Sequence, residues 1–171
     1  PANIRAGGFT LDHGGDSLLI SILLLIHVGG AIIGFGPSFT FALLGPMAAK
    51  AGPNGGVALM EAMVAIEKRL ILPVAMVTQP LSGLALIFVA GYSTAFFSHT
   101  WLWVALLLYA AGFYLAILVQ TPRIEKMIHL AKAGPPTPEF GALGKKTAQL
   151  GPVITVILTA IIVLMVTKPG G

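Results

Sequence analysis

The chain has 171 residues, of which 56% are hydrophobic and only 9% are charged, and its mean hydropathy is +0.92. This composition excludes a water-soluble globular domain, is typical of an integral membrane protein, and at this length allows one compact bundle. Cysteine does not occur, which excludes disulfides, thiolate-bound iron–sulfur clusters and thiol catalysis. The formal net charge of +4 comes from basic residues in short segments between hydrophobic runs, so it indicates membrane topology and not a nucleic-acid partner.

The first hydrophobic run covers residues 18–44, which exceeds the ~20 residues that a helix needs to cross a membrane. Gly36 and Pro37 near its end predict a kink or an unwound last turn. The following residues, 45–56, are rich in Gly, Pro and Asn and predict a loop.

Residues 57–69 have a helical composition with several charges, and we interpret them as a water-exposed lead-in to a second span at residues 70–91. Pro73 and Pro80 within this span are tolerated as kinks if neighbouring groups satisfy the freed carbonyls. The next loop, 92–99, is short and uncharged, so the second and third spans should form an antiparallel hairpin.

The third span covers residues 101–120 and continues as a charged extension over 121–132. A connector broken by Pro and Gly follows, and the fourth span covers residues 150–167. We therefore expect an all-α protein with one domain: an antiparallel bundle of four transmembrane helices, the second and third of which extend beyond the membrane.

Basic residues are distributed unequally over the two sides of this bundle. Arg5 and Lys168 are the two on one side, and the eight on the other are Lys50, Lys68, Arg69, Arg123, Lys126, Lys132, Lys145 and Lys146. Because basic loops stay in the cytoplasm, both termini should lie outside. The aromatic residues at the outer end of the central hairpin fit an interfacial belt: Tyr92, Phe96, Phe97, Trp101 and Trp103.

His27 lies inside the first span, where an ionisable side chain is costly and suggests a functional site or a specific packing need. Gly30 and Gly34 share its helix face because positions three and four apart stack on one side. The Gly-x-x-x-Gly spacing lets a second helix approach closely, and it would equally let a flat macrocycle lie beside an axial imidazole.

The second span places Met76, Gln79, Ser82 and Gly83 on one soft or polar face. By helical rise, His27 lies ~14 Å, Tyr109 ~12 Å and Gln79 ~18 Å from the outer ends of their spans. These three side chains can therefore meet if their helix faces point inward.

Three interpretations of His27 remain open. It forms a hydrogen bond to Gln79 or Tyr109 that only fixes the helix register, it is an axial ligand of haem b, or it binds Cu(I) together with a methionine. No second histidine lies at matching depth, since the others, His13, His99 and His129, lie in or beyond the interfaces. A bis-histidine haem within one subunit is thus disfavoured, whereas a five-coordinate haem, Met76, or a ligand from a partner subunit stays possible.

The remaining charged residues suggest structural roles. Glu61 and Glu67 are expected to pair with Lys68, Arg69 or Arg123, and His129 lies on a solvated helix end. The sequence has no phosphate-binding loop, no Ser-His-Asp order and no acidic residue inside a span, so hydrolytic chemistry and cation-coupled transport are disfavoured. No residue is assigned a catalytic role.

Several motifs resemble a bacterial family of predicted four-helix integral membrane proteins of unknown function: HVGGAIIGFG, QPLSGLALI, WLWVALLLYAAGFYLAILVQ and LMVTKP. More distantly, the chain is similar to copper-resistance protein D and to HemJ-type membrane proteins, of which the latter are associated with haem. Only His27 matches that pattern, and the basic residues of the HemJ-type enzymes have no counterpart in the bundle, so their catalytic activity does not transfer. The resemblance implies a multi-pass protein of the bacterial cytoplasmic (inner) membrane.

Two functions are therefore predicted. The first is a haem-b-type redox or electron-transfer component, with His27 as the axial and only metal ligand of this chain and the rest of the site formed by Gly30, Gly34, Met76, Gln79 and Tyr109. The second is a non-catalytic accessory or scaffold subunit of a larger respiratory or photosynthetic membrane complex. Expected partners are the lipid bilayer and either other membrane subunits or further copies of the chain.

Overall fold

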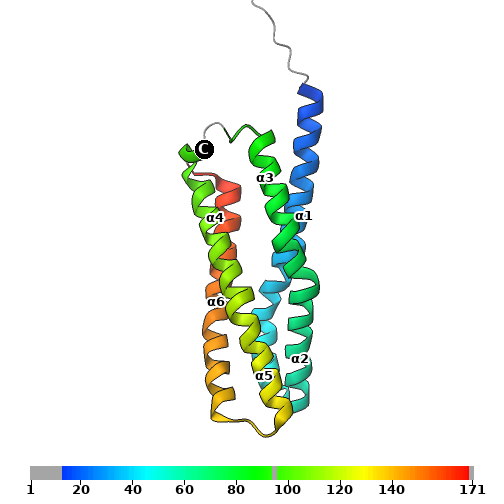
Figure 1. The fold of residues 1–171 in the computed structure, drawn as a ribbon, viewed down its shortest axis with the longest axis vertical. Coiled ribbons are helices and arrows are strands. Elements are labelled where there is room, and N and C mark those ends of the chain that lie inside the picture. The colour runs from blue at the N-terminus through cyan, green and yellow to red at the C-terminus, as the bar shows by residue number, and fades with distance from the viewer. Residues whose placement is uncertain (1–12, 94–95, 170–171) are drawn as a thin grey trace, which may run out of the picture.

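The computed structural model describes residues 13–93 and 96–169, and all regular secondary structure in this part of the chain is helical (Figure 1). Three π-helical segments lie within the longer helices, at Glu67–Ile71, Val74–Thr78 and Tyr114–Gln120. A 3₁₀ turn covers Phe96–Ser98. The α-helices are α1 His13–Lys50, α2 Gly52–Ile66, α3 Gln79–Val89, α4 Thr100–Phe113, α5 Thr121–Ala133 and α6 Pro138–Thr167.

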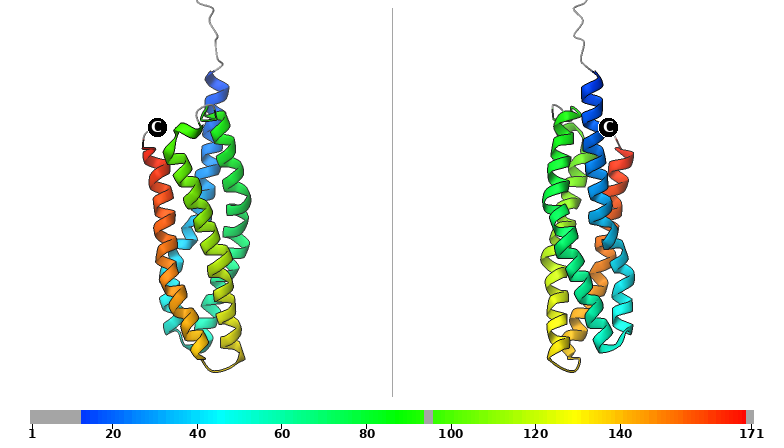
Figure 2. Two further views of the ribbon diagram at one scale, coloured as in Figure 1. Left: turned by 60° about the vertical axis from the view of Figure 1, so that its left-hand side comes forward. Right: turned by 90° about the vertical axis from the view of Figure 1, so that its right-hand side faces the viewer.

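These helices form four long rods, because α2 continues into α3 and α4 continues into α5. Each rod is long and apolar enough to cross a membrane, which confirms the predicted all-α membrane fold. Figure 2 shows the rods side by side along the long axis of the molecule. One end of the bundle, which we call the basic end, carries the α1–α2 and α5–α6 connections, and the opposite end, the termini end, carries the α3–α4 connection and the C-terminal end of α6 (Figure 1).

The predicted loop at residues 45–56 is wrong. α1 continues through Pro46 to Lys50, and only Ala51 separates it from α2. Gly52 adopts a positive φ of 72°, which allows the reversal, and the proline that follows it is favoured in a first helical turn because its missing N–H needs no partner there. Gly56 lets the two helices approach, since a Cβ there would lie 2.7 Å from the Ala48 carbonyl oxygen.

Prolines have different effects at different positions. Pro37 does not unwind α1, which stays helical around it. By contrast, each of the three π-helical segments ends two residues before a proline, namely Pro73, Pro80 and Pro122. A proline cannot donate to the preceding turn and its ring crowds that turn, so a wider turn before it relieves the clash.

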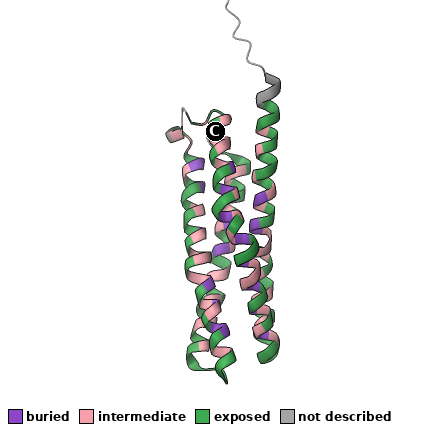
Figure 3. Ribbon diagram, turned by 45° about the vertical axis from the view of Figure 1, so that its right-hand side comes forward, coloured by how far each residue is buried: buried purple, intermediate pink, exposed green. Residues whose placement is uncertain are grey.

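The bundle has two hydrophobic cores, and its buried residues are spread along the length of the helices (Figure 3). The core within the membrane consists of buried residues from α1 and α6, namely Phe35, Ile154, Leu158 and Ile161. The second core joins α2 to α5 toward the basic end and consists of Met60, Ile124, Met127 and Ile128. The rod from Gly52 to Val89 has 38 residues, or ~57 Å by helical rise, against ~30 Å of hydrocarbon, so the second core lies in an extension outside the membrane.

Ion pairs tie this extension together. Glu61 pairs with Lys132, and the other two pairs are Lys68 with Glu125 and Lys126 with Glu139. The expected partners of Glu61 and Glu67 are therefore wrong. Glu67 is buried and bonds to Thr121 instead, because its helix face points inward whereas Lys68 and Arg69 face outward.

Candidate functional site around His27

His27 lies at the contact between α1 and α3. Its Nδ1 atom is 2.8 Å from the Ser82 hydroxyl oxygen, which in turn donates to the Thr78 carbonyl oxygen at 2.5 Å. Gln79 donates from Nε2 to the backbone carbonyl of His27 at 2.8 Å. Gly83 lies against the ring, since a Cβ there would be 3.1 Å from Cε1 of His27. The rod from Gly52 to Val89, which we call the second rod, thus holds both the side chain and the backbone of His27.

This hydrogen-bond chain selects one tautomer of the imidazole. A serine hydroxyl has a single hydrogen, and the short contact to Thr78 assigns that hydrogen to the carbonyl oxygen. Ser82 must then accept from His27, so a neutral ring carries its hydrogen on Nδ1 and a lone pair on Nε2. Within residues 13–93 and 96–169, no hydrogen bond engages this Nε2 atom.

The glycines beside His27 serve the contact between the two rods. A Cβ at Gly30 would lie 2.8 Å from Nε2 of Gln79, and a Cβ at Gly34 would lie 2.9 Å from Cγ1 of Val74. Both glycines are therefore covered by the second rod, as expected for a Gly-x-x-x-Gly helix contact. The structure favours the helix contact, because the second rod leaves no open space at these two glycines. The alternative use of this face, as a platform for a macrocycle, stays a prediction.

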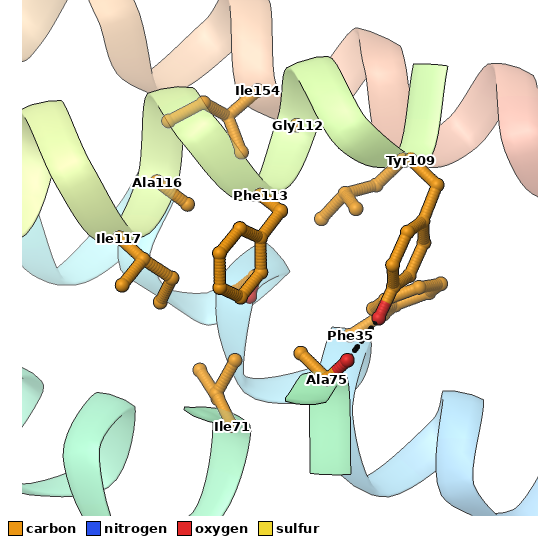
Figure 4. A pocket seen from close by; sticks show the side chains of 11 residues that line it. Phe35, Ile71, Ala75, Tyr109, Gly112, Phe113, Ala116, Ile117 and Ile154 are labelled. Atoms are coloured by element: carbon orange, nitrogen blue, oxygen red, sulfur yellow. Dashed lines mark hydrogen bonds between the residues drawn. The ribbon is translucent and has the colours of Figure 1, made fainter. Parts of the chain in front are cut away.

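Tyr109 and Met76 are not part of the cluster around His27. Tyr109 donates its hydroxyl hydrogen to the Ala75 carbonyl oxygen, and its ring centroid lies 6.4 Å from that of Phe35 (Figure 4). It lines a partly open pocket of about 40 Å³, which is large enough for water but far too small for a haem. Met76 is 61% exposed on the outer surface.

The structure thus brings His27, Gly30, Gly34 and Gln79 together and leaves Met76 and Tyr109 apart from them. Ser82 and Thr78 are the members that the predicted site lacks. The sequence does carry a signal for Ser82, because it shares a helix face with Gln79 at a spacing of three residues. Thr78 contributes only its carbonyl, which no side-chain pattern can predict.

The arrangement offers a single protein nitrogen as a ligand. In the part of the chain that the structure describes, no group of three or more His, Asp or Glu side chains is placed to hold a metal ion. A metal bound here would take one ligand from His27 and the others from a macrocycle or from another molecule.

Comparison with known families decides to which group of proteins the chain belongs. Residues 21–169 match the family described as "Predicted integral membrane protein (DUF2269)". The chain belongs to the DUF2269 family. This confirms the resemblance to a predicted integral membrane family of unknown function, and with it the assignment to a lipid bilayer.

None of the curated proteins or solved structures matches the chain significantly. The more distant similarity of this DUF2269 member to copper-resistance protein D and HemJ-type proteins therefore stays a prediction.

Proposed function

We propose that this DUF2269 protein is a membrane subunit that provides one axial ligand, Nε2 of His27, to the iron of a haem b. The observation that supports the proposal is the hydrogen-bond chain from His27 through Ser82 to Thr78, which leaves a lone pair on Nε2. Histidines that bind metals commonly donate their other ring nitrogen to a neighbouring oxygen in this way, which fixes the tautomer and the ring orientation.

The size of the macrocycle limits where such a haem can bind. The pocket of about 40 Å³ beside Tyr109 cannot hold it, and Gly30 and Gly34 are covered by the second rod. A haem held by the half-buried His27 would therefore lie outside the packed interior, on the outer surface of the bundle. When bound, the haem would supply one-electron redox chemistry, and the protein would hold the iron through one imidazole.

A haem on the surface of this chain would need another protein molecule to cover its exposed part. The other groups that contact such a haem would come from another subunit or from a second copy of this chain, because this chain has no second histidine at the depth of His27. A complex of this kind combines a redox role with the predicted place of the protein in a larger membrane assembly.

A haem titration of the purified protein in detergent tests this proposal. Wild-type protein should bind haemin with a saturable Soret shift, and His27→Ala should abolish the shift. His129→Ala is the matched control, since this histidine is exposed on the extension at the basic end. The His129→Ala protein should bind haemin as the wild type does. Equal binding by the wild type and His27→Ala would refute the proposal.

A second candidate is a scaffold subunit without a cofactor. It is supported by an apolar groove between α4 and α6 in which Thr159 is the single polar side chain, and its lining residues are Val104, Leu108, Val156, Thr159, Ala160, Val163 and Leu164. A helix of another subunit would fill such a groove by packing alone, because association in lipid depends on close contact. Native mass spectrometry from mild detergent that returns only the monomer would rule this candidate out.

A further inference from the structure

Lys168 lies over a group of aromatic rings at the termini end. Its Nζ atom is 3.4 Å from the Tyr92 hydroxyl oxygen, 5.6 Å from the Tyr92 ring centroid and 5.7 Å from the Trp101 ring centroid. Figure 1 shows why they meet: the C-terminal end of α6 lies beside the start of α4 and the α3–α4 connection. Three segments that are distant in the sequence thus converge at one point.

The rings beneath Lys168 form a continuous wall. Tyr92 contacts His99 edge-on at a centroid distance of 5.0 Å and Trp101 edge-on at 5.7 Å, and His99 lies 6.3 Å from Trp101. We call these four residues, Tyr92, His99, Trp101 and Lys168, the Lys168 cluster. Trp101 is only 4% exposed, so the wall is a packed and well-defined feature.

Two nitrogen atoms in this cluster are buried without a partner. Neither Nε1 of Trp101 nor Nδ1 of His99 has a hydrogen-bond partner among the residues that the structure describes. An indole N–H is only a donor, so what it lacks is an acceptor. Buried polar groups in proteins nearly always have partners, so an orphaned donor needs an explanation, and a bound water or ion is one of them.

The local backbone adds to this excess of donors. α4 begins at Thr100, directly after His99, and no side chain caps this helix end. The first turn of a helix presents unpaired N–H groups and a partial positive charge, both of which favour an anion. The described acidic side chains all lie in the other half of the molecule, in the extension and its boundary: Glu61, Glu67, Glu125 and Glu139.

Lys168 itself is held in an uncommon conformation. Its φ of 41° makes it the one non-glycine residue with a positive φ in the described ranges, and its N–H closes α6 by donating to the Leu164 carbonyl oxygen at 2.9 Å. Glycine is usual at such a helix end because a side chain is strained there. A lysine at this position carries its ammonium group to the ring wall at the expense of backbone strain.

We propose that the Lys168 cluster binds an oxyanion of the phosphate class. The Lys168 ammonium, the Trp101 indole N–H and the Tyr92 hydroxyl would donate to its oxygens, and the uncapped start of α4 would add its partial charge. Hydrogen bonds between an ammonium and a phosphate are charge-assisted and therefore strong. The ligand is either the phosphate of a lipid headgroup, because the cluster lies where the spans end, or a free phosphate from the water on that side.

Fluorescence of Trp101 reports directly on the orphaned indole. The chain has two tryptophans, so a Trp103→Phe background leaves Trp101 as the single tryptophan, which is excited selectively at wavelengths where the three tyrosines do not absorb. This protein is purified in dodecyl maltoside micelles, whose headgroups carry no phosphate. It is titrated with inorganic phosphate at constant ionic strength and, in parallel, with increasing phosphatidylglycerol. A saturable change with phosphate identifies a free anion as the ligand, and a change with phosphatidylglycerol alone identifies a lipid headgroup.

Variants of the lysine separate binding from folding. Lys168→Gln should weaken the response at least about tenfold, because it removes the charge-assisted donor. Lys168→Arg keeps a cation and should retain the response, and Lys50→Gln at the basic end is the matched control that should leave it unchanged. No saturable change with either probe would overturn the proposal, and so would a response of wild-type strength in a folded Lys168→Gln protein.

Discussion

The Nδ1 atom of His27 lies 2.8 Å from the Oγ atom of Ser82, and this contact joins two helices across 55 positions of the chain. Since the hydroxyl hydrogen of Ser82 goes to Thr78, the contact both holds the ring and determines which nitrogen is free. The two effects are separable, because one concerns the stability of the bundle and the other concerns ligand binding at Nε2.

Ser82→Ala should destabilise the protein and weaken haem binding. Interhelical polar bonds in membranes contribute ~0.6–2 kcal/mol, and we expect a loss in that range in SDS-induced unfolding of the detergent-solubilised protein. Loss of the partner that orients a ligating histidine typically lowers affinity ~10–100-fold, which the haemin titration would measure. Ser21→Ala is the control, because that exposed hydroxyl bonds only within its own helix, to the Ser17 carbonyl. Unchanged stability and affinity in Ser82→Ala would contradict this account of the contact.

Alanine substitution of two glycines on α1 should change the free energy of unfolding in opposite directions. Gly34→Ala places a methyl group 2.9 Å from a branched valine side chain, so the rods must separate and the free energy of unfolding should fall. Gly29→Ala meets nothing within 4 Å, and it should stabilise the helix by ~0.5–1 kcal/mol because alanine restricts the unfolded chain. The same unfolding assay checks both. Equal effects at the two positions would show that the second rod does not cover Gly34.

Glu67 should tolerate an amide in place of its carboxyl group. It is 8% exposed, and its hydrogen-bond partner Thr121 already donates its hydroxyl hydrogen to the Ala116 carbonyl oxygen at 3.0 Å. The Thr121 oxygen can therefore only accept a hydrogen bond from residue 67. A side-chain amide can donate to it, whereas an ionised carboxylate has no hydrogen to donate. Glu67→Gln should therefore stay within ~1 kcal/mol of the wild type, whereas Glu67→Ala leaves a gap and should cost ~1–3 kcal/mol in the unfolding assay.

The exposed Glu61→Gln variant is the control for this position. It breaks a surface ion pair with Lys132, and such pairs contribute ~0–1 kcal/mol. A strong destabilisation by Glu67→Gln would mean that the negative charge itself is needed, and it would refute the hydrogen-bond assignment.

The orientation in the membrane can be tested with single cysteine substitutions. The chain contains no native cysteine that would first have to be removed. The excess of basic residues predicts that Lys50→Cys is shielded in intact cells and that Thr100→Cys is labelled by a thiol reagent that does not cross membranes. Labelling of Lys50→Cys alone in intact cells would reverse the predicted topology.

Helix number and approximate spans follow from hydrophobicity, because a membrane requires long apolar helices whatever their neighbours are. The end of the first helix does not follow in this way. Gly45, Pro46 and Pro53 predict a loop from composition, yet the structure continues α1 to Lys50 and reverses at one glycine. Packing of Gly56 against Ala48 favours the continued helix over the loop. This contact can be predicted only if it is known which helices are adjacent.

The same limit applies to the site. Helical spacing correctly places Gly30 and Gly34 on the face of His27, and depth correctly relates Gln79 to it. Depth alone also relates Tyr109 to His27, but the tyrosine hydroxyl reaches the Ala75 carbonyl oxygen and not the His27 ring. Which groups a side chain meets at a given depth depends on how the helices are placed and rotated around one another, and the uniform hydrophobicity of these spans leaves this undetermined.

Chemical rescue tests most directly whether Nε2 of His27 binds the haem iron. His27→Gly is purified with bound haem removed, and the Soret spectrum is recorded with haemin before and after addition of free imidazole. We predict that the variant lacks the wild-type spectrum and that imidazole, which occupies the vacated space, restores it. A wild-type spectrum in the variant without imidazole, or no haem spectrum in the wild-type protein, would contradict the claim.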